Sequence, residues 1–197
     1  MDRVVARFSA PEIGGTRSPR FIYERRLAFE ARLVALSDRS HKSKDGKYRE
    51  RHLRRAMERH IAETLLGALD IVPAPSAKDV ESRVQAARLA LLQRIGGQAV
   101  LAEAAHAEGI EHSEIFYMMR RQARASIYLD RMVTPMLRPS EAELRNVHRG
   151  VSTPYSAKPF REIAADLRRW YVANRLASAL ASFYENARSR LRLDLVP

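Results

Sequence analysis

The stretch RLRLDLVP, Arg190 to Pro197, carries the alternation that decides the fold. Three leucines alternate there with Arg192 and Asp194. A period of two places the leucines on one face of an extended strand and the charged side chains on the other. Almost every other segment has helical spacing, so the fold depends on what this strand pairs with.

A second alternating stretch lies near the other end of the chain. In RVVARF, Arg3 to Phe8, the apolar residues Val4, Ala6 and Phe8 recur at every second position. An isolated strand exposes unpaired backbone donors and acceptors, so the simplest partner of each strand is the other. The sequence therefore predicts a mainly α fold in which a small antiparallel sheet pairs the N- and C-terminal strands.

Helical periodicity accounts for most residues between these strands. Turn-rich links are predicted at 11–19 and 150–159, and a polar, exposed loop at 38–47. Two capping signals, Ser76 with Asp79 and Ser140 with Glu143, each open a helix. The predicted helices cover residues 20–37, 48–70, 77–95, 98–109, 113–133, 141–149 and 159–190.

The length and the apolar content are typical of one helical domain over residues 1–197. The chain is 46% apolar, which is enough to fill a core. We expect residues 1–47 to hold the first strand, a helix and the basic loop, 48–149 the helical core, and 150–197 the long last helix and the closing strand. No run of eighteen apolar residues occurs, so no transmembrane segment is expected.

The composition excludes several kinds of chemistry. The chain has no cysteine, which rules out disulfides, thiolate metal sites and cysteine nucleophiles. Its formal net charge is +12, from thirty arginines and five lysines against 23 acidic residues. Such a charge attracts phosphates, anionic lipids or acidic protein surfaces. The arginines are spread along most of the helices, so we prefer a compositional bias to nucleic-acid binding as their explanation.

No pattern of an active site is present. Glu103 and His106 form a single E-x-x-H, whereas a carboxylate-bridged di-iron site needs that motif twice with two further glutamates. The stretches IGGQ and EIGG lack the lysine and the spacing of a phosphate-binding P-loop, and no serine stands in a glycine elbow. We therefore expect no catalytic residue, no bound metal and no cofactor.

The most basic segment is KSKDGKYRERHLRRAMER, Lys42 to Arg59, with a net charge of +5. Two interpretations stay open. The segment is a binding face for nucleic acid, anionic lipid or an acidic partner, or it is a solvated helix face whose arginines pair with neighbours such as Glu50 and Glu58. We prefer the second interpretation. The residues of this basic face are Arg49, Arg51, Arg54, Arg55 and Arg59.

Large apolar side chains are dense on two of the predicted helices. IFYMM, Ile115 to Met119, places five of them in succession, more than one helix stripe can bury. Methionine is flexible and polarizable, which suits an adaptable peptide-binding surface. Packing between helices is the more common role of such residues, and an exposed excess is what polypeptide binding requires. The candidate peptide-binding residues are Phe116, Tyr117, Met118, Met119, Trp170 and Tyr171.

A series of short motifs follows in a fixed order from Arg49 onward. They comprise Ile61, Leu65 and Leu66; Ile71, Asp79, Val80 and Glu81; Gly96 and Gly97; Gly109, Ile110, Arg120, Arg121 and Tyr128; Pro139, Ser140, Glu141, Glu143 and Leu144; and Pro159, Phe160, Glu162 and Ile163. In this order they resemble the helical chaperone module of SurA-type periplasmic chaperones and their peptidyl-prolyl isomerase relatives. The terminal strand of that module corresponds to LRLDLV, 191–196.

The resemblance implies a chaperone part without the isomerase, because only nine residues lie between Arg149 and Pro159, where the parvulin domain would be inserted. It implies capture of extended apolar segments of unfolded envelope proteins in a groove between helices. A removed leader would place the protein in the periplasm or cell envelope, and a native start at Met1 in the cytoplasm. Two other interpretations stay open: an adaptor subunit with one fixed partner, and a basic helical nucleic-acid-binding protein.

Overall fold

The structure of the protein, a computed structural model, describes residues 2–11, 16–38, 47–190 and 192–196. The predicted loop at 38–47 lies mostly outside these residues, as does Leu191 of the closing strand. The strands are β1 (Val4–Ala10), β2 (Thr16–Tyr23) and β3 (Arg192–Leu195). The α-helices are α1 (Glu24–Ser37), α2 (Glu50–Ala68), α3 (Ala77–Ile95), α4 (Gln98–Ala107), α5 (His112–Tyr128), α6 (Glu141–Gly150) and α7 (Phe160–Arg190). A π-helical turn, Leu129–Val133, and a 3₁₀ turn, Thr134–Leu137, extend α5.

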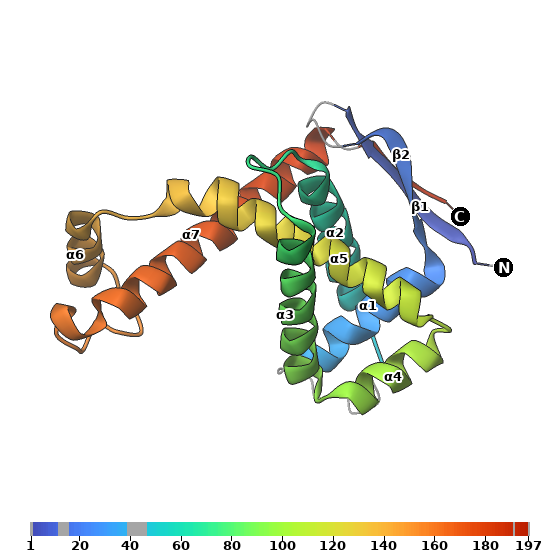
Figure 1. Ribbon diagram of the computed structural model, residues 1–197, viewed down its shortest axis with the longest axis horizontal. Helices are drawn as coiled ribbons and strands as arrows, with labels where there is room; N and C mark the ends of the chain where they lie inside the picture. Colours follow the sequence, from blue (N-terminus) through green and yellow to red (C-terminus); the bar gives the residue numbers. More distant parts are fainter. Residues whose placement is uncertain (1, 12–15, 39–46, 191, 197) are drawn as a thin grey trace.

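The two ends of the chain meet in an antiparallel sheet (Figure 1). Phe8 of β1 lies opposite Leu193 of β3, and Ala6 lies opposite Leu195. The N–H of Val196 donates to the carbonyl oxygen of Val5 at 3.1 Å, which extends the pairing by one more bond. The predicted pairing of the terminal strands is confirmed, and with it the mainly α fold with a small sheet.

The sheet has a further strand that the sequence did not predict. Residues 16–23, expected as the end of a link and the start of a helix, form β2, which pairs with the other edge of β1. Ile22 is fully buried and its neighbour Phe21 is 47% exposed, as a period of two requires. Pro19 is tolerated because β2 is an edge strand. The helix prediction is wrong before Glu24 because pairing with β1 satisfies the backbone of this stretch.

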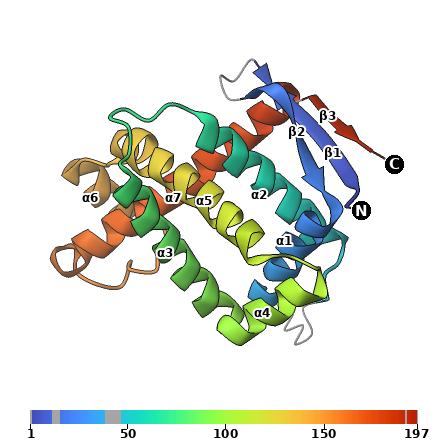
Figure 2. The same ribbon diagram turned by 45° about the vertical axis from the view of Figure 1, so that its right-hand side comes forward.

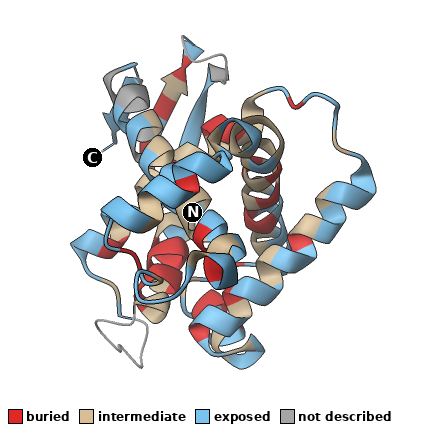
Figure 3. Cartoon of the chain, turned by 90° about the vertical axis from the view of Figure 1, so that its left-hand side faces the viewer, coloured by how far each residue is buried: buried red, intermediate tan, exposed pale blue. Residues whose placement is uncertain are grey.

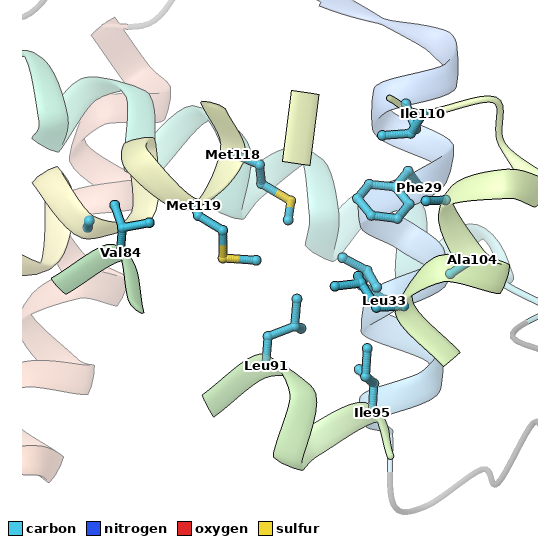
Figure 4. Close-up of a cluster of buried hydrophobic side chains, with 12 residues drawn as sticks. Phe29, Leu33, Val84, Leu91, Ile95, Ala104, Ile110, Met118 and Met119 are labelled. Carbon is cyan, nitrogen blue, oxygen red and sulfur yellow. The ribbon is translucent and has the colours of Figure 1, made fainter. Parts of the chain in front are cut away.

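Two apolar clusters hold the sheet and the helices together. In the smaller cluster, Phe8 and Ile22 on the buried face of the sheet pack against Ile61 and Leu65 of α2. The larger forms where α1, α3, α4 and α5 meet, and Figure 4 shows its side chains pointing toward one another. Each large apolar side chain buried in this way contributes about 1.5–3 kcal/mol. Helix α1 contributes to both sides of the packing, because its apolar residues contact α2 as well as the larger cluster.

Helix α6 and the first part of α7 form an arm that extends away from the other helices (Figures 1 and 2). The arm has a small cluster of its own, in which Leu144 of α6 packs on Ile163 and Leu167 of α7. Among the α7 side chains that the structure describes, only Ile163 and Leu167 are buried. In Figure 3 the buried residues lie in short stretches of the helices while exposed residues cover their outer sides. The other side chains of α7 that the structure describes are thus at least partly exposed.

The N-terminus of α3 has the predicted capping box and allows a test. Ser76 Oγ accepts the N–H of Asp79 at 3.1 Å, and the Asp79 carboxylate accepts the N–H of Ser76 at 3.0 Å. Ser76→Ala is expected to lower the free energy of unfolding by about 1 kcal/mol, because a helix N–H loses its partner. Urea denaturation followed by circular dichroism measures the change. The control, Ser82→Ala at an exposed position of α3, should be neutral or slightly stabilising; equal losses would contradict the role of the cap.

Candidate functional site

The IFYMM stretch divides between the surface and the core. Phe116 is 39% exposed and Tyr117 is 63% exposed, whereas Met118 and Met119 are almost fully buried. Figure 4 shows Met118 and Met119 in the large cluster, with Phe29 and Leu33 of α1 nearby. The two methionines therefore act in core packing, and Tyr117 has the most accessible side chain of the four candidates on α5.

The two candidates on α7 belong to a different part of the molecule. Trp170 and Tyr171 are partly buried against the α6–α7 cluster around Leu144. That cluster shares no residue with the one that contains Met118 and Met119. The structure thus does not bring the six predicted peptide-binding residues together in one groove.

A pocket that is mostly apolar lies farther along α7, on the side that faces α2 and the end of α5. Its volume is about 210 Å³. It is lined by Leu66 and Leu69, by Tyr128, Leu129 and Val133, and by Leu176, Ala179, Leu180 and Phe183. The α7 residues recur at intervals of three and four, the signal of one helix face, so the sequence contained this stripe. None of the six candidate peptide-binding residues lies in this stripe, so the prediction missed it.

A second pocket, of about 350 Å³, opens between the β1–β2 hairpin and helices α1, α2 and α5. Its lining is formed by Phe8, Pro19, Arg20, Phe21, Tyr23, Arg26, His60, Thr64, Tyr117, Met118 and Arg121. The lining includes the guanidinium groups of three arginines and no carboxylate. The pocket is thus lined by both arginines and aromatic rings, and Tyr117 and Met118 are the predicted residues that reach it.

Charged side chains are buried behind the second pocket. Arg121 Nη2 donates to Glu30 Oε1 at 2.7 Å, and Arg121 Nε donates to Glu63 Oε2 at 3.1 Å. His60 Nδ1 lies 3.0 Å from the same Glu30 oxygen. Arg59 Nε lies 3.4 Å from Glu63. Glu30 is fully buried, so its charge depends on these partners for stabilisation.

The network fixes the protonation states near the pocket. Burial alone would raise the pKa of the Glu30 carboxyl, but the charge of Arg121 and the hydrogen bonds from Arg121 and His60 outweigh burial and lower the pKa to about 2. Burial lowers the pKa of His60, despite the opposing effect of Glu30. At neutral pH Glu30 is therefore ionised and His60 is neutral, so the cations of this region are arginines.

The basic-face arginines differ in their surroundings. Arg54 Nη2 pairs with Glu50 at 3.1 Å and Arg51 Nη2 with Asp38 at 3.2 Å. Arg59 turns toward Glu63 and the buried network. Arg49 precedes α2 and Arg55 is exposed. The pairing of Arg54 with Glu50 agrees with the interpretation of this segment as a solvated helix face with local ion pairs.

Among the described residues, no three His, Asp or Glu side chains are grouped closely enough to hold a metal ion. Glu103 and His106 are both exposed on α4. In the same part of the chain, none of the helices has the length and apolarity needed to cross a bilayer.

A scan against protein-family models, a search of curated proteins and a search of solved structures found no match to this chain.

Proposed function

We propose that the protein is a non-catalytic, chaperone-like module that binds extended apolar segments of unfolded polypeptides reversibly. The observation that carries the proposal is the apolar pocket along α7. Leu176, Ala179 and Leu180 form one face of α7, and each is only partly buried. A helix stripe of this kind that stays partly exposed marks a surface for apolar partners.

The size of the pocket favours single side chains as its occupants. A volume of about 210 Å³ lies below the range of about 300–1,000 Å³ that holds drug-sized ligands. An extended chain presents its side chains one at a time, so successive apolar residues of different sequences can occupy the pocket. Only a small area is buried in each such contact, which keeps binding weak and reversible.

An adaptor subunit with one fixed partner is the second candidate, and the arm of α6 and α7 favours it. The arm projects from the other helices and has its own apolar cluster around Leu144 (Figure 1), which is a shape suited to docking on one surface. Recovery of a single stoichiometric partner would favour the adaptor.

A nucleic-acid-binding function is disfavoured because Arg51 and Arg54 of the basic face already pair with acidic residues.

Two leucines of the pocket allow a direct test. The variant Leu176→Gln/Leu180→Gln is expected to bind an unfolded outer-membrane polypeptide about tenfold more weakly than the unchanged protein, because two partly exposed apolar contacts are lost. Fluorescence anisotropy of the labelled polypeptide measures the affinity, and light scattering measures the suppression of its aggregation. Glutamine keeps the helix propensity of α7 high, so loss of the helix is not expected.

The matched control is Ala177→Gln/Ser178→Gln, at two exposed positions of the same helix. It should leave the affinity unchanged. Apolar capture should also change little between low and moderate salt, whereas binding through phosphates would weaken steeply. Equal affinities of the two double variants, or a steep salt dependence, would contradict the proposal.

A further inference from the structure

We infer that the pocket between the β1–β2 hairpin, α2 and α5 binds a carboxylate attached to an apolar or aromatic group. Under the proposed function, on which this part of the inference rests, the carboxylate is the C-terminal group or an acidic side chain of the bound polypeptide. The pocket would then recognise a charge, while the apolar pocket on α7 accepts side chains of any apolar type.

The charges of the lining carry the first step. Arg20, Arg26 and Arg121 line the pocket, and no acidic residue does. The side chain of Arg20 forms no ion pair or hydrogen bond with any residue that the structure describes. The Nε of Arg26 is buried and makes no hydrogen bond to the described residues, although its Nη2 lies 3.4 Å from Glu114. Guanidinium donors without a partner in such a site favour an anionic ligand, and a planar carboxylate matches their geometry.

The buried network makes one side of the pocket rigid. Glu30 and Glu63 hold the guanidinium of Arg121 through its Nη2 and Nε. Thr64 Oγ1, which also lines the pocket, donates to the carbonyl oxygen of His60 at 2.7 Å. These donors already have partners within the protein, so an entering anion is met by the guanidinium of Arg20, beside a pocket side whose shape is fixed.

The aromatic residues of the lining determine what the anion is attached to. They are Phe8, Phe21, Tyr23 and Tyr117. Phe21 is 47% exposed and Tyr117 is 63% exposed, so two large rings face solvent at this site. Aromatic rings together with arginines in one lining suit a ligand with an apolar body and one charged end, because both parts are then desolvated against matching groups. A bare inorganic anion would leave the aromatic rings without a contact.

The test uses two small probes that differ in one group. N-acetylphenylalanine has a free carboxylate, and N-acetylphenylalaninamide is its neutral counterpart. Titrations followed by NMR should show the acid binding at least about tenfold more tightly than the amide, because a charge-assisted hydrogen bond is lost in the amide. The Arg20→Gln variant should weaken binding of the acid by about three- to tenfold and leave binding of the amide unchanged.

Arg7→Gln is the matched control, since Arg7 is an exposed arginine of the adjacent strand and does not line the pocket. It should leave both affinities unchanged. Tyr117→Ser, at an exposed position, should weaken both probes and still fold. Equal binding of acid and amide would overturn the inference, as would displacement of the acid by inorganic phosphate at concentrations at which acetate has no effect.

A set of three peptide probes separates this inference from the proposed function. An unstructured apolar peptide is prepared with a free C-terminus, as its C-terminal amide, and as the amide with one internal glutamate. Tighter binding of the first or the third identifies which carboxylate of a polypeptide is recognised. If no form of the peptide binds but N-acetylphenylalanine does, the proposed function fails and the carboxylate pocket stands. If all three forms bind equally, polypeptide binding stands and the carboxylate inference fails.

Discussion

Replacing Arg121 with methionine is expected to lower the free energy of unfolding by about 3–5 kcal/mol. The Arg121 side chain is 14% exposed and lies between the carboxylates of Glu30 and Glu63. Removing it leaves the fully buried charge of Glu30 with His60 as its nearest partner, at 3.0 Å, and burial favours the neutral form of that histidine. A buried charge without compensation is among the most destabilising changes known in proteins. Urea denaturation at pH 7 measures the loss.

The neighbouring arginine provides the control for this prediction. Arg120 is exposed on the same helix, so Arg120→Met makes the same chemical change and should alter stability by less than about 0.5 kcal/mol. The double variant Glu30→Gln/Arg121→Met should recover part of the loss, because the two residues interact directly. A loss below about 1 kcal/mol in Arg121→Met would show that the buried ion pair does not stabilise the fold.

The elements that could be predicted from the sequence are those whose pattern is local. The alternation in RLRLDLVP and in RVVARF indicated strands, and their pairing followed because each lacked another visible partner. The boundaries of most helices followed from capping residues and apolar spacing, as at Ser76 and Ser140. These signals depend on a few neighbouring residues, so they can be recognised before the fold is known.

Strand β2 was missed because its signal was ambiguous. Pro19, Phe21 and Ile22 precede a helix directly, and apolar residues so close to a helix can be counted into its periodicity. What makes residues 16–23 a strand is the edge of β1, with Ile22 placed beside Ala6. Tertiary pairing overrode the local pattern there, as is common for short strands.

The sites illustrate the same limit. Glu30, His60 and Arg121 lie on three helices, and Glu30 and Arg121 are 91 residues apart, so no spacing rule connects them. The three arginines of the second pocket come from β2, α1 and α5 for the same reason. By contrast, the stripe of Leu176 and Leu180 could be recognised from the sequence, because these residues lie on consecutive turns of one helix.

Acidification is expected to remove about 3 kcal/mol of stability through Glu30 alone. The pKa of this carboxyl is about 2 in the folded protein, below its ordinary value of 4.5. The unfolded chain therefore binds the proton first as the pH falls. The stability that Glu30 contributes is present above about pH 4.5 and is lost progressively as the pH falls toward 2.

The neighbours of Glu30 change where this loss begins. The lowered pKa of His60 acts in the same direction, because the unfolded chain takes up that proton first below its ordinary pKa of 6.5. Burial raises the pKa of Glu63, and this opposes the trend, since the folded protein then binds a proton more readily than the unfolded chain. The contribution of His60 should thus begin to be lost below about pH 6.5, with Glu63 opposing it, and stability should fall most steeply below about pH 4.5 through Glu30.

Urea denaturation at a series of pH values from 7 to 3 tests this profile. Glu30→Gln should be less stable than the unchanged protein at pH 7 and should lose less stability on acidification, because the carboxyl that binds the extra proton in the unfolded chain is absent. Glu103→Gln removes an exposed carboxylate on α4 and should leave the slope of the profile unchanged. If Glu30→Gln and the unchanged protein lost stability in parallel below pH 4.5, Glu30 would already be protonated in the fold, and Arg121 could not be held by its charge.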